Sequence, residues 1–340
     1  MTPRLPLVSV CIANYNGIAV LDDCLQSVLQ QEGDIPLEIL VHDDASSDGS
    51  VAYIRDHYPT ARLIESKGNV GFCVANNRMV AEAQGKYLLL LNNDAALYPD
   101  ALKTLLAEAC RLQQPAILGL PQYDAGSGEL IDIGSLFDPF LNPVPNLTRD
   151  RNEVGMIIGA CFWLPRTLWT QLGGFPEWFD TLAEDMYLCV RARLAGHPVR
   201  AIDKSGFRHF VGHSLGGGKV TMEKRLVTSW RRRTFSERNK SFVMALTYPA
   251  PLFQMIFPLH LVLLILEGAT LALVKRERTL FQRIYLACLR SLWGERTRLV
   301  RLRREIQAER KISVRSFWSV FQMMPHKLQL LLRHGLPHLN

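Results

Sequence analysis

Short apolar runs alternate, along the first third of the chain, with segments whose apolar residues recur at every third or fourth position. The short runs are typical of buried strands, and the periodic segments are typical of amphipathic helices. The expected strands are residues 7–12, 37–41, 61–65 and 86–91, and the expected helices are residues 19–30, 50–57, 71–84 and 99–112. Because strands and helices alternate, the pattern predicts an α/β fold with a mainly parallel sheet covered on both faces.

The pattern is less regular in the middle of the chain. Residues 115–151 contain many Gly and Pro residues and have no clear periodicity, so both short strands and a mobile loop fit them. The next expected elements are a strand over 159–164, a helix over 167–172 and a helix over 184–195 that ends at Gly196. They extend the α/β region well beyond the midpoint of the chain.

An uncharged apolar stretch begins at Ser241 and continues to Leu266, and Glu267 is the only charged residue before Lys275. A membrane-spanning helix needs about 20 apolar residues, so the length permits one over 252–274. Five residues in this stretch oppose a simple span: Pro249, Pro251, Pro258, His260 and Glu267. They favour helices that lie at the membrane interface or enter the bilayer without crossing it, and a helix packed inside a globular fold is the alternative.

The charge of the chain is divided unevenly. Residues 1–206 carry 15 Lys/Arg and 25 Asp/Glu, so their charge is 15 − 25 = −10, whereas residues 207–340 carry 24 and 7, which gives 24 − 7 = +17. A basic region with apolar helices is typical of segments that bind anionic membranes. We expect no nucleic-acid partner. A nucleic acid would pair with the basic residues but would leave the adjacent apolar stretch without a nonpolar surface to contact.

Helical spacing continues over residues 280–293 and over the Arg-rich residues 296–311. The change in composition predicts two domains. The first is an α/β domain over 1–240, and the second is a helical, apolar and basic extension over 241–340 that associates with a membrane surface.

The number and spacing of the cysteines indicate whether the protein works in a reducing or an oxidising compartment. The seven cysteines are scattered and none forms a C-x-x-C pair, so neither a zinc ribbon nor a disulfide scaffold is indicated, and buried thiols are expected. Asn14 and Asn16 interrupt the first apolar run before it reaches the length of a secretion signal. We therefore expect a cytoplasmic protein that is peripheral at the inner face of the cell membrane.

Polar residues follow three of the expected strands at their carboxyl ends, namely Asn14, Asp44 and the run Asn92-Asn93-Asp94. Parallel sheets bind ligands at that edge, so these residues are expected to share one crevice. The Asp44 carboxylate is suited to accept hydrogen bonds from a base or from ribose hydroxyls, and Asp94 is suited to bind Mg²⁺ or Mn²⁺. Taken singly, each fits a turn or a helix cap equally well.

Two further candidates lie later in the chain. Glu184 and Asp185 open a helix, where a carboxylate serves either as a general base or as an N-terminal cap. His209 and His213 have the i, i+4 spacing of some zinc sites, but the neighbouring glycines Gly212 and Gly216 oppose a zinc-binding helix.

Taken together in order and spacing, these motifs resemble the family 2 glycosyltransferases over about residues 7–215. The matching residues of the first half are Val8-Ser9-Val10, Asn14-Tyr15-Asn16-Gly17, the run Asp43 to Ser50, Asn69-Val70-Gly71-Phe72, Ala75-Asn76-Asn77 and Leu90-Leu91-Asn92-Asn93-Asp94. Those of the second half are Gly159-Ala160, Gly173-Gly174-Phe175, Glu184-Asp185-Met186-Tyr187-Leu188, Arg191, Gly196, His209, Gly212 and Ser214. The resemblance implies the GT-A fold, with a Rossmann-like sheet and an inverting mechanism.

The resemblance also implies residue roles. The nucleotide-sugar site would comprise Ala13, Asn14, Tyr15, Asp44, Asn69, Gly71, Asn92 and Asn93. Asp94 and His209 would bind a divalent metal, Mg²⁺ or Mn²⁺, although Asn92 stands where the first acid of the family's D-x-D signature often occurs. Asp185 would deprotonate the acceptor hydroxyl, with Glu184 and Arg191 orienting the helix and the base.

The implied activity is transfer of one sugar from a dTDP-, UDP- or GDP-linked donor to a glycan or lipid-linked glycan acceptor, in cell-surface polysaccharide biosynthesis. The most similar subgroup includes rhamnosyltransferases. The Q-x-x-R-W signature of processive synthases is absent at Ser229-Trp230-Arg231. Two alternatives are a sugar-phosphate nucleotidyltransferase, whose Gly-rich basic phosphate loop is missing after the first strand, and a non-catalytic nucleotide-sugar or membrane-binding module.

Overall fold

The structure is a computed structural model that describes residues 5–210, 217–220, 226–334 and 338–339. The chain divides into two compact units. The first unit comprises Met1–Ser135, Pro145–Ala192 and His197–Val211, and the second comprises Leu136–Val144, Arg193–Gly196 and Gly212–Asn340. Each unit is described by itself.

A seven-stranded sheet forms the centre of the first unit, in the order β12-β6-β11-β4-β1-β2-β3. Its strands are β1 (Val8–Asn14), β2 (Leu37–Asp43), β3 (Arg62–Glu65), β4 (Tyr87–Asn92), β6 (Ile117–Gly119), β11 (Cys161–Pro165) and β12 (Val199–Ala201). Only β11 runs against its neighbours β4 and β6, while the other pairs are parallel. The mainly parallel sheet expected from the sequence is confirmed.

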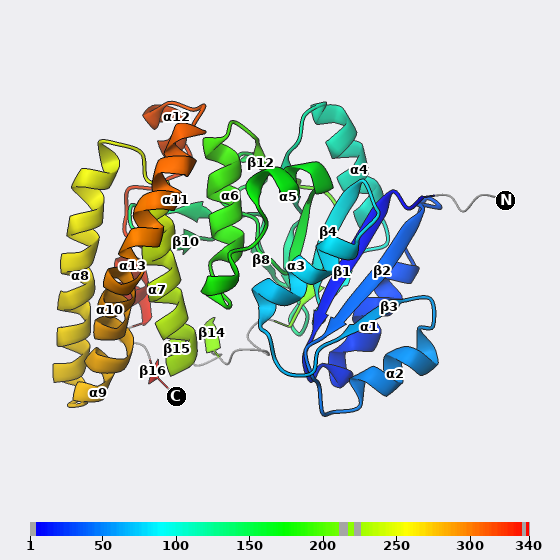
Figure 1. Ribbon diagram of the computed structural model, residues 1–340, viewed down its shortest axis with the longest axis horizontal. Helices are drawn as coiled ribbons and strands as arrows, with labels where there is room; N and C mark the ends of the chain where they lie inside the picture. Colours follow the sequence, from blue (N-terminus) through cyan, green and yellow to red (C-terminus); the bar gives the residue numbers. More distant parts are fainter. Residues whose placement is uncertain (1–4, 211–216, 221–225, 335–337, 340) are drawn as a thin grey trace. The chain divides into compact units, whose positions relative to one another are not determined.

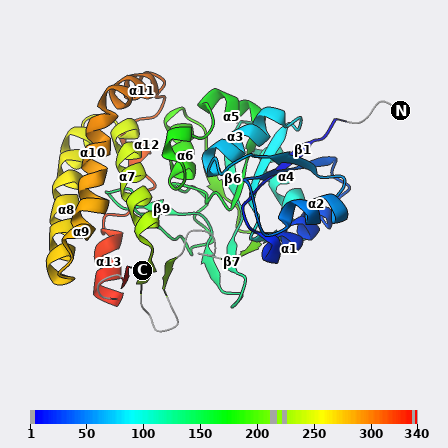
Figure 2. The ribbon, with the colours of Figure 1, turned by 60° about the horizontal axis from the view of Figure 1, so that its bottom comes forward.

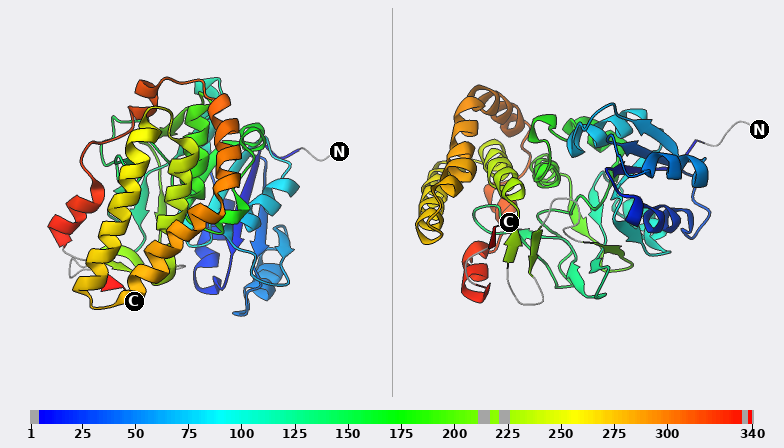
Figure 3. Two further views of the ribbon diagram at one scale, coloured as in Figure 1. Left: turned by 60° about the vertical axis from the view of Figure 1, so that its left-hand side comes forward. Right: turned by 90° about the horizontal axis from the view of Figure 1, so that it is seen from below.

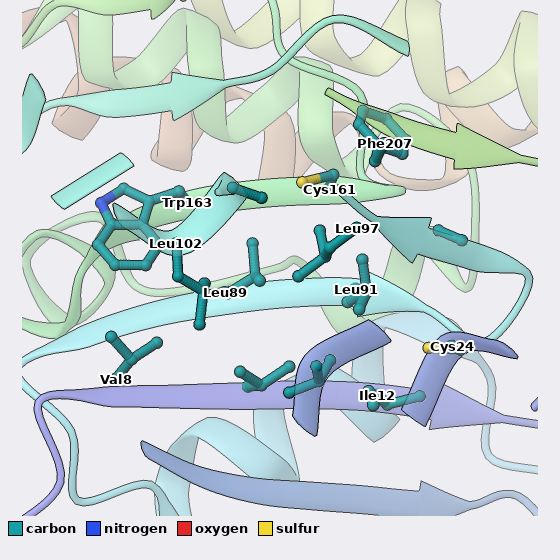
Figure 4. Close-up of a cluster of buried hydrophobic side chains, with 14 of the residues drawn as sticks. Val8, Ile12, Cys24, Leu89, Leu91, Leu97, Leu102, Cys161, Trp163 and Phe207 are labelled. Atoms are coloured by element: carbon teal, nitrogen blue, oxygen red, sulfur yellow. The ribbon is translucent and has the colours of Figure 1, made fainter. Parts of the chain in front are cut away.

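Helices cover both faces of this sheet (Figures 2 and 3). They are α1 (Ile18–Leu29), α2 (Ser50–His57), α3 (Phe72–Glu82), α4 (Ala101–Leu112), α5 (Arg166–Leu172) and α6 (Glu184–Leu194), with a 3₁₀ turn over Glu177–Phe179. On one face, alternate residues of β1 and β4 pack with α1 and α4 into a buried cluster that includes Val8, Leu89 and Trp163 (Figure 4). The parallel pairing of β1 with β2 and β4 places the polar ends of these strands at a single edge.

A smaller four-stranded sheet adjoins the end of β4, in the order β5-β13-β7-β8. Its strands are β5 (Ala95–Leu97), β13 (Phe207–His209), β7 (Gln122–Asp124) and β8 (Leu130–Asp132). Residues 115–151, for which the sequence allowed either short strands or a mobile loop, thus contain short strands. The residues Gly212, His213 and Ser214 lie outside the described ranges, so the zinc spacing and the last matching motif are not described.

The second unit is mainly helical (Figure 1). Its helices are α7 (Trp230–Thr247), α8 (Leu252–Val274), α9 (Arg278–Leu280), a π-helical turn over Phe281–Leu286, α10 (Ala287–Gly294), α11 (Arg296–Ala308), α12 (Val314–Trp318) and α13 (His326–His334). Its short strands are β9 (Leu136–Phe137), β10 (Pro143–Val144), β14 (Gly217–Val220), β15 (Leu226–Thr228) and β16 (His338–Leu339). Helix α7 packs against α8, α10 and α11.

Helix α8 covers the stretch for which the sequence left an interfacial helix, a re-entrant helix and a packed helix open. It is a single helix of 23 residues that continues through Pro258. Two of its polar residues are held by partners within the unit: His260 is hydrogen-bonded to Ser241 at 2.8 Å, and Glu267 pairs with Lys327 at 2.8 Å. Two others, Gln254 and Thr270, are exposed. In the described part of the chain, α8 is the one helix whose length and mean hydropathy would permit a membrane span.

The cysteines are all unpaired thiols. Six are buried, as expected, and Cys110 is exposed on α4. Apolar surroundings explain the buried thiols, because burial raises the pKa of Cys161 to about 12 and keeps the group neutral.

Candidate active site

The Asn14 side chain joins the ends of three strands. Its Nδ2 donates to Asp43 Oδ2 at 2.8 Å, and its Oδ1 accepts from Asn93 Nδ2 at 2.8 Å. All three residues are buried, so each polar group is satisfied by another one rather than by water. The structure thus brings together the carboxyl ends of β1, β2 and β4, as the strand-end rule predicts. Next to Asn14, Ala13 is half-buried and the Tyr15 ring is 54% exposed.

Asp44 organises the loop that precedes α3. Its two carboxylate oxygens accept hydrogen bonds from the backbone N–H groups of Val70 at 2.6 Å and Gly71 at 3.0 Å. Gly71 has φ of +86°, and a Cβ atom there would lie 2.6 Å from Asp180 Oδ1. Glycine is therefore required at this position both by conformation and by space. Asn69, in the same loop, is exposed.

Asp94 and His209 lie together at the end of β4. The His209 Nε2 atom is 3.1 Å from Asp94 Oδ1, and both side chains are buried. The contact follows from strand register, because His209 is opposite Ala95 in the antiparallel pair of β13 and β5. On its other side, His209 Nδ1 is 2.9 Å from Gln122 Nε2.

The pair fits a divalent cation as a partial ligand set. A carboxylate oxygen and an imidazole nitrogen are donors that suit Mn²⁺, and Asp94 oxygen also suits Mg²⁺. Rotation of the Gln122 amide would let its oxygen accept from Nδ1–H of His209 and leave Nε2 available as a ligand. The described residues contain no group of three or more His, Cys, Asp or Glu side chains that would enclose a metal. Asn92 is half-buried.

Asp185 is held at the start of α6 with a fixed orientation. Its Oδ2 accepts from the backbone N–H of Gly159 at 2.9 Å, and its Oδ1 accepts from that of Met186 at 2.7 Å. The side chain is 9% exposed. The preceding turn contains positive φ angles at the non-glycine residues Asp180, Leu182 and Ala183. Such conformations are costly and persist where the surroundings enforce them, which is common at functional sites.

Gly159 and Ala160 connect the two acidic sites. The Ala160 carbonyl accepts from the backbone N–H of Asn92 at 3.0 Å, while the Gly159 N–H donates to Asp185. These two residues precede β11, which begins at Cys161 rather than at the expected Gly159. One dipeptide therefore links the end of β4, which leads into Asp94, to the carboxylate on α6.

The two supporting residues differ in their positions. Glu184 is buried in the first turn of α6, next to Asp185. Arg191 lies farther along the helix, where its Nη1 donates to the Leu172 carbonyl at 2.5 Å and its guanidinium is 5.7 Å from the centre of the Tyr187 ring. It thus ties α6 to the end of α5.

Gln122 was not singled out from the sequence, and Asn77 appeared there only within a matching motif. Gln122 contacts His209 from 87 positions away, and only the pairing of β7 with β13 brings them together. Asn77 exchanges two hydrogen bonds with the backbone of Phe175, at 2.9 and 3.1 Å. Asn77 and Phe175 both belong to motifs that match the family, so the sequence marked both residues, although it did not show that they touch.

Comparison with known proteins agrees with this geometry. The model of the family "Glycosyl transferase family 2" matches residues 9–171. An N-acetylglucosaminyl-diphospho-decaprenol L-rhamnosyltransferase from Mycobacterium tuberculosis is 28% identical over 246 residues, which are 64% of this chain and 79% of that protein. The chain spans 36% or less of the length of several other relatives, among them an Escherichia coli chondroitin synthase that is 36% identical over 190 residues, 54% of this chain and 26% of that protein.

Solved structures share the fold at low sequence identity. The S. aureus TarS structure in complex with UDP-GlcNAc has a TM-score of 0.56 at 15% identity, covering 92% of this chain and 90% of that one. A mannosyltransferase from Pyrobaculum calidifontis in complex with GDP-Man and Mn²⁺ has a TM-score of 0.51 at 18% identity, covering 86% and 89%. The mainly parallel sheet, the helical C-terminal region and the family match all point to the same family and fold. The chain belongs to the family 2 glycosyltransferases and has the GT-A fold.

Proposed function

We propose that this chain is an inverting, metal-dependent glycosyltransferase that moves one sugar from a nucleotide-diphosphate donor to a lipid-linked glycan at the inner face of the cell membrane, in cell-surface polysaccharide biosynthesis. The observation that carries the proposal is the Gly159-Ala160 link. It connects the Asp185 carboxylate to the strand end that leads into Asp94. Sugar transfer needs these two functions next to each other, because one activates the acceptor and the other stabilises the leaving diphosphate.

The donor side is assigned to the edge formed by β1, β2 and β4. In the proposal, the base and ribose lie against Ala13, Asn14 and Tyr15, and Asp44 shapes the loop that includes Asn69 and Gly71. Support comes from the buried polar network around Asn14 and from the exposed Tyr15 ring, which is available for stacking. Asn92 and Asn93 complete this edge next to the diphosphate.

A divalent ion, Mg²⁺ or Mn²⁺, is assigned to Asp94 and His209. When bound, it would neutralise the negative charge that develops on the leaving nucleotide diphosphate. The protein's contribution is to hold the carboxylate and the imidazole together in a buried position, with Gln122 fixing the orientation of the imidazole ring.

Asp185 is assigned as the general base. Two backbone N–H groups donate to its carboxylate and hold its orientation. In the proposed reaction Asp185 accepts the proton of the acceptor hydroxyl, the hydroxyl oxygen attacks the anomeric carbon, and the bond to the diphosphate breaks on the opposite side. The displacement inverts the configuration of that carbon. Glu184 and Arg191 hold the helix that carries the base.

The acceptor and the location rest on the second unit. Most of the exposed residues of α8 are apolar, and the 207–340 segment carries a charge of +17. Both properties suit a surface that contacts anionic lipids. The name of the Mycobacterium tuberculosis relative specifies a diphospho-decaprenol acceptor and rhamnose. A lipid-linked acceptor and dTDP-rhamnose are therefore the first substrates to test here, followed by UDP- and GDP-linked donors.

Asp185→Asn tests the assignment of the base. The amide keeps an acceptor for the Gly159 N–H but does not take a proton, so we expect turnover to fall by about 10²–10⁴-fold with little change in melting temperature. Transfer is measured by mass spectrometry of the glycosylated acceptor, with the donor that the panel identifies.

Asp56→Asn is the matched control, since Asp56 is exposed on α2 and undergoes the same chemical change. Near-normal turnover of Asp185→Asn would show that another group is the base. Binding of a nucleotide sugar by the unsubstituted chain, without transfer to any acceptor in the panel, would instead favour a non-catalytic module.

A further inference from the structure

The second unit contains a cavity of about 670 Å³ between α7, α8, α13 and the segment 140–143. Its volume is within the range of about 300–1,000 Å³ that is common for small-molecule sites. The helices around it are drawn in Figures 1 and 3. No residue assigned to sugar transfer lines this cavity.

The floor of the cavity carries excess positive charge. Four cationic side chains line it: Arg232, Arg233, Lys240 and Lys327. Two acidic residues, Glu237 and Glu267, also line it, so the net charge is 4 − 2 = +2 with His260 and His326 neutral. Each acid is already paired with two lining cations. Glu237 pairs with Lys327 at 2.5 Å and with Lys240 at 2.9 Å, and Glu267 pairs with the same Lys327 ammonium at 2.8 Å and with the Arg233 guanidinium.

The cationic floor is a built site. Lys240 is 4% exposed, and its ammonium donates to Asn142 Oδ1 at 2.7 Å. Buried Nε–H of Arg233 has no hydrogen-bond partner among the described residues. A buried donor without a partner is uncommon and is satisfied when an acceptor binds next to it. Phosphate oxygens are strong acceptors for guanidinium and ammonium groups.

The rim of the cavity has the opposite character. It contains four leucines that are all at least 40% exposed, Leu263 and Leu266 from α8 and Leu328 and Leu331 from α13. The apolar surface continues along α8 to Leu259, which is 49% exposed. A cationic floor below an apolar rim matches an amphiphile whose anionic head lies inside and whose hydrocarbon chain leaves past the leucines.

We propose that this cavity binds the phosphate headgroup of a membrane lipid, with the lipid's hydrocarbon chain lying over the leucine rim. The site would fix the second unit to the bilayer through one specific lipid, in addition to general attraction to the surface. The inference rests on the membrane association in the proposed function, but it does not depend on the chemistry assigned to Asp185.

Binding of a short-chain phosphatidic acid, kept below its micellar concentration, tests the site in the full chain by isothermal titration calorimetry. We expect one lipid per chain. Arg232→Gln should weaken binding by about tenfold or more, because a hydrogen bond to a charged group is lost. Arg231→Gln is the matched control, since Arg231 is the adjacent exposed residue on α7 and does not line the cavity.

A second pair of variants tests the rim. Leu331→Glu places a negative charge at the opening and should abolish detectable binding, whereas Leu332→Glu on the same helix should have little effect. Leu332 is 72% exposed and does not line the cavity, so both variants change the net charge equally. Because Leu331 is itself 45% exposed, the substitution should leave the fold intact.

Three results would overturn the proposal: no binding of the lipid, equal effects within either pair of variants, or binding of inorganic phosphate as tight as that of phosphatidic acid. The last would indicate a site for a free anion. The outcome is distinguishable from a failure of the proposed function. If the unsubstituted chain transfers sugar and binds vesicles that contain phosphatidylglycerol, but calorimetry detects no binding of short-chain phosphatidic acid, only the headgroup site is wrong.

Discussion

Asn14 and Asn93 hydrogen-bond to each other, and the space next to them is available only because residue 17 lacks a side chain. A Cβ atom at Gly17 would lie 2.1 Å from Asn93 Nδ2 and 2.4 Å from Asn14 Oδ1. The φ angle of Gly17 is −106°, so glycine is required here by space and not by conformation. The polar network at the strand ends thus depends on a residue that takes no part in its hydrogen bonds.

Gly17→Ala should therefore separate Asn14 from Asn93. We expect overpacking to cost about 1–3 kcal/mol of folding free energy and the donor KM to rise. Thermal unfolding and donor-dependent kinetics measure the two effects. Gly68→Ala is the control, because a Cβ atom at Gly68 meets nothing within 4 Å. Equal melting temperatures and KM values for the two variants would contradict the packing argument.

At the level of elements, α7 and α13 are connected by a buried cluster of charges. Glu237, which is 4% exposed, pairs with Lys240 at 2.9 Å and with Lys327 at 2.5 Å. Burial opposes ionisation, but Lys240, Lys327 and Arg233 together hold the pKa of the Glu237 carboxyl well below its usual range. Removing one member of such a cluster leaves buried charge uncompensated.

Glu237→Gln should lower the free energy of unfolding by about 3–5 kcal/mol. A carboxyl with a lowered folded-state pKa contributes stability above its unfolded pKa of about 4.3, and this contribution is lost as the pH falls through the folded pKa. The unsubstituted chain should therefore lose this stability only below about pH 4.3, and the variant should lose less there. Urea unfolding across pH measures both.

Glu305→Gln on α11 is the control for this change, since Glu305 is exposed. If Glu237→Gln and Glu305→Gln unfold at the same denaturant concentration near neutral pH, the buried cluster does not stabilise the contact between α7 and α13.

The sequence predicted five of the seven strands of the central sheet and missed the short strands β6 and β12. A longer buried strand and an amphipathic helix each have a distinct hydrophobic period, which made the five recognisable. The expected strand 37–41 is observed as Leu37–Asp43, because the polar residues His42 and Asp43 also pair within the sheet. Residues 115–151 were not predictable in the same way. Three-residue strands such as β7 have too few positions to display a period, and their partners are distant in sequence.

The prolines left the form of α8 open at the level of sequence. Pro usually ends or bends a helix, but Pro258 lies within α8 after its first turns. The sequence also placed Asp44, Asp94 and Asp185 near strand and helix ends, and the structure has them there. What it could not provide was their contacts, since Gly159, Gln122 and the loop at Val70 are brought in by tertiary packing alone.

At the scale of the whole molecule, the charge is divided along the chain, at −10 for residues 1–206 and +17 for residues 207–340. A membrane that attracts the second segment would repel the first at the same time. Attraction of this kind acts through water and is weakened by salt, whereas apolar contact is not.

Binding to vesicles that contain phosphatidylglycerol should therefore fall by at least about tenfold between ~0.1 M and ~1 M salt, where the Debye length shrinks from ~10 to ~3 Å. Co-sedimentation of the full chain with vesicles measures this. Vesicles of phosphatidylcholine alone serve as the control and should bind weakly at both salt concentrations. If binding did not depend on salt or on lipid charge, the apolar face of α8 would account for membrane binding and the basic residues would not contribute to it.

The Gly159-Ala160 link has a practical consequence for altering this enzyme. A change of residue that shifts this dipeptide would move the backbone of Asn92 and the side chain of Asp185 together, because each is hydrogen-bonded to one of the two residues. Under the proposed assignments, varying these two positions in a search for a new donor or acceptor would disturb the general base and the donor side together. Diversity is better directed to exposed positions such as Asn69, where a new side chain meets solvent and leaves the dipeptide in place.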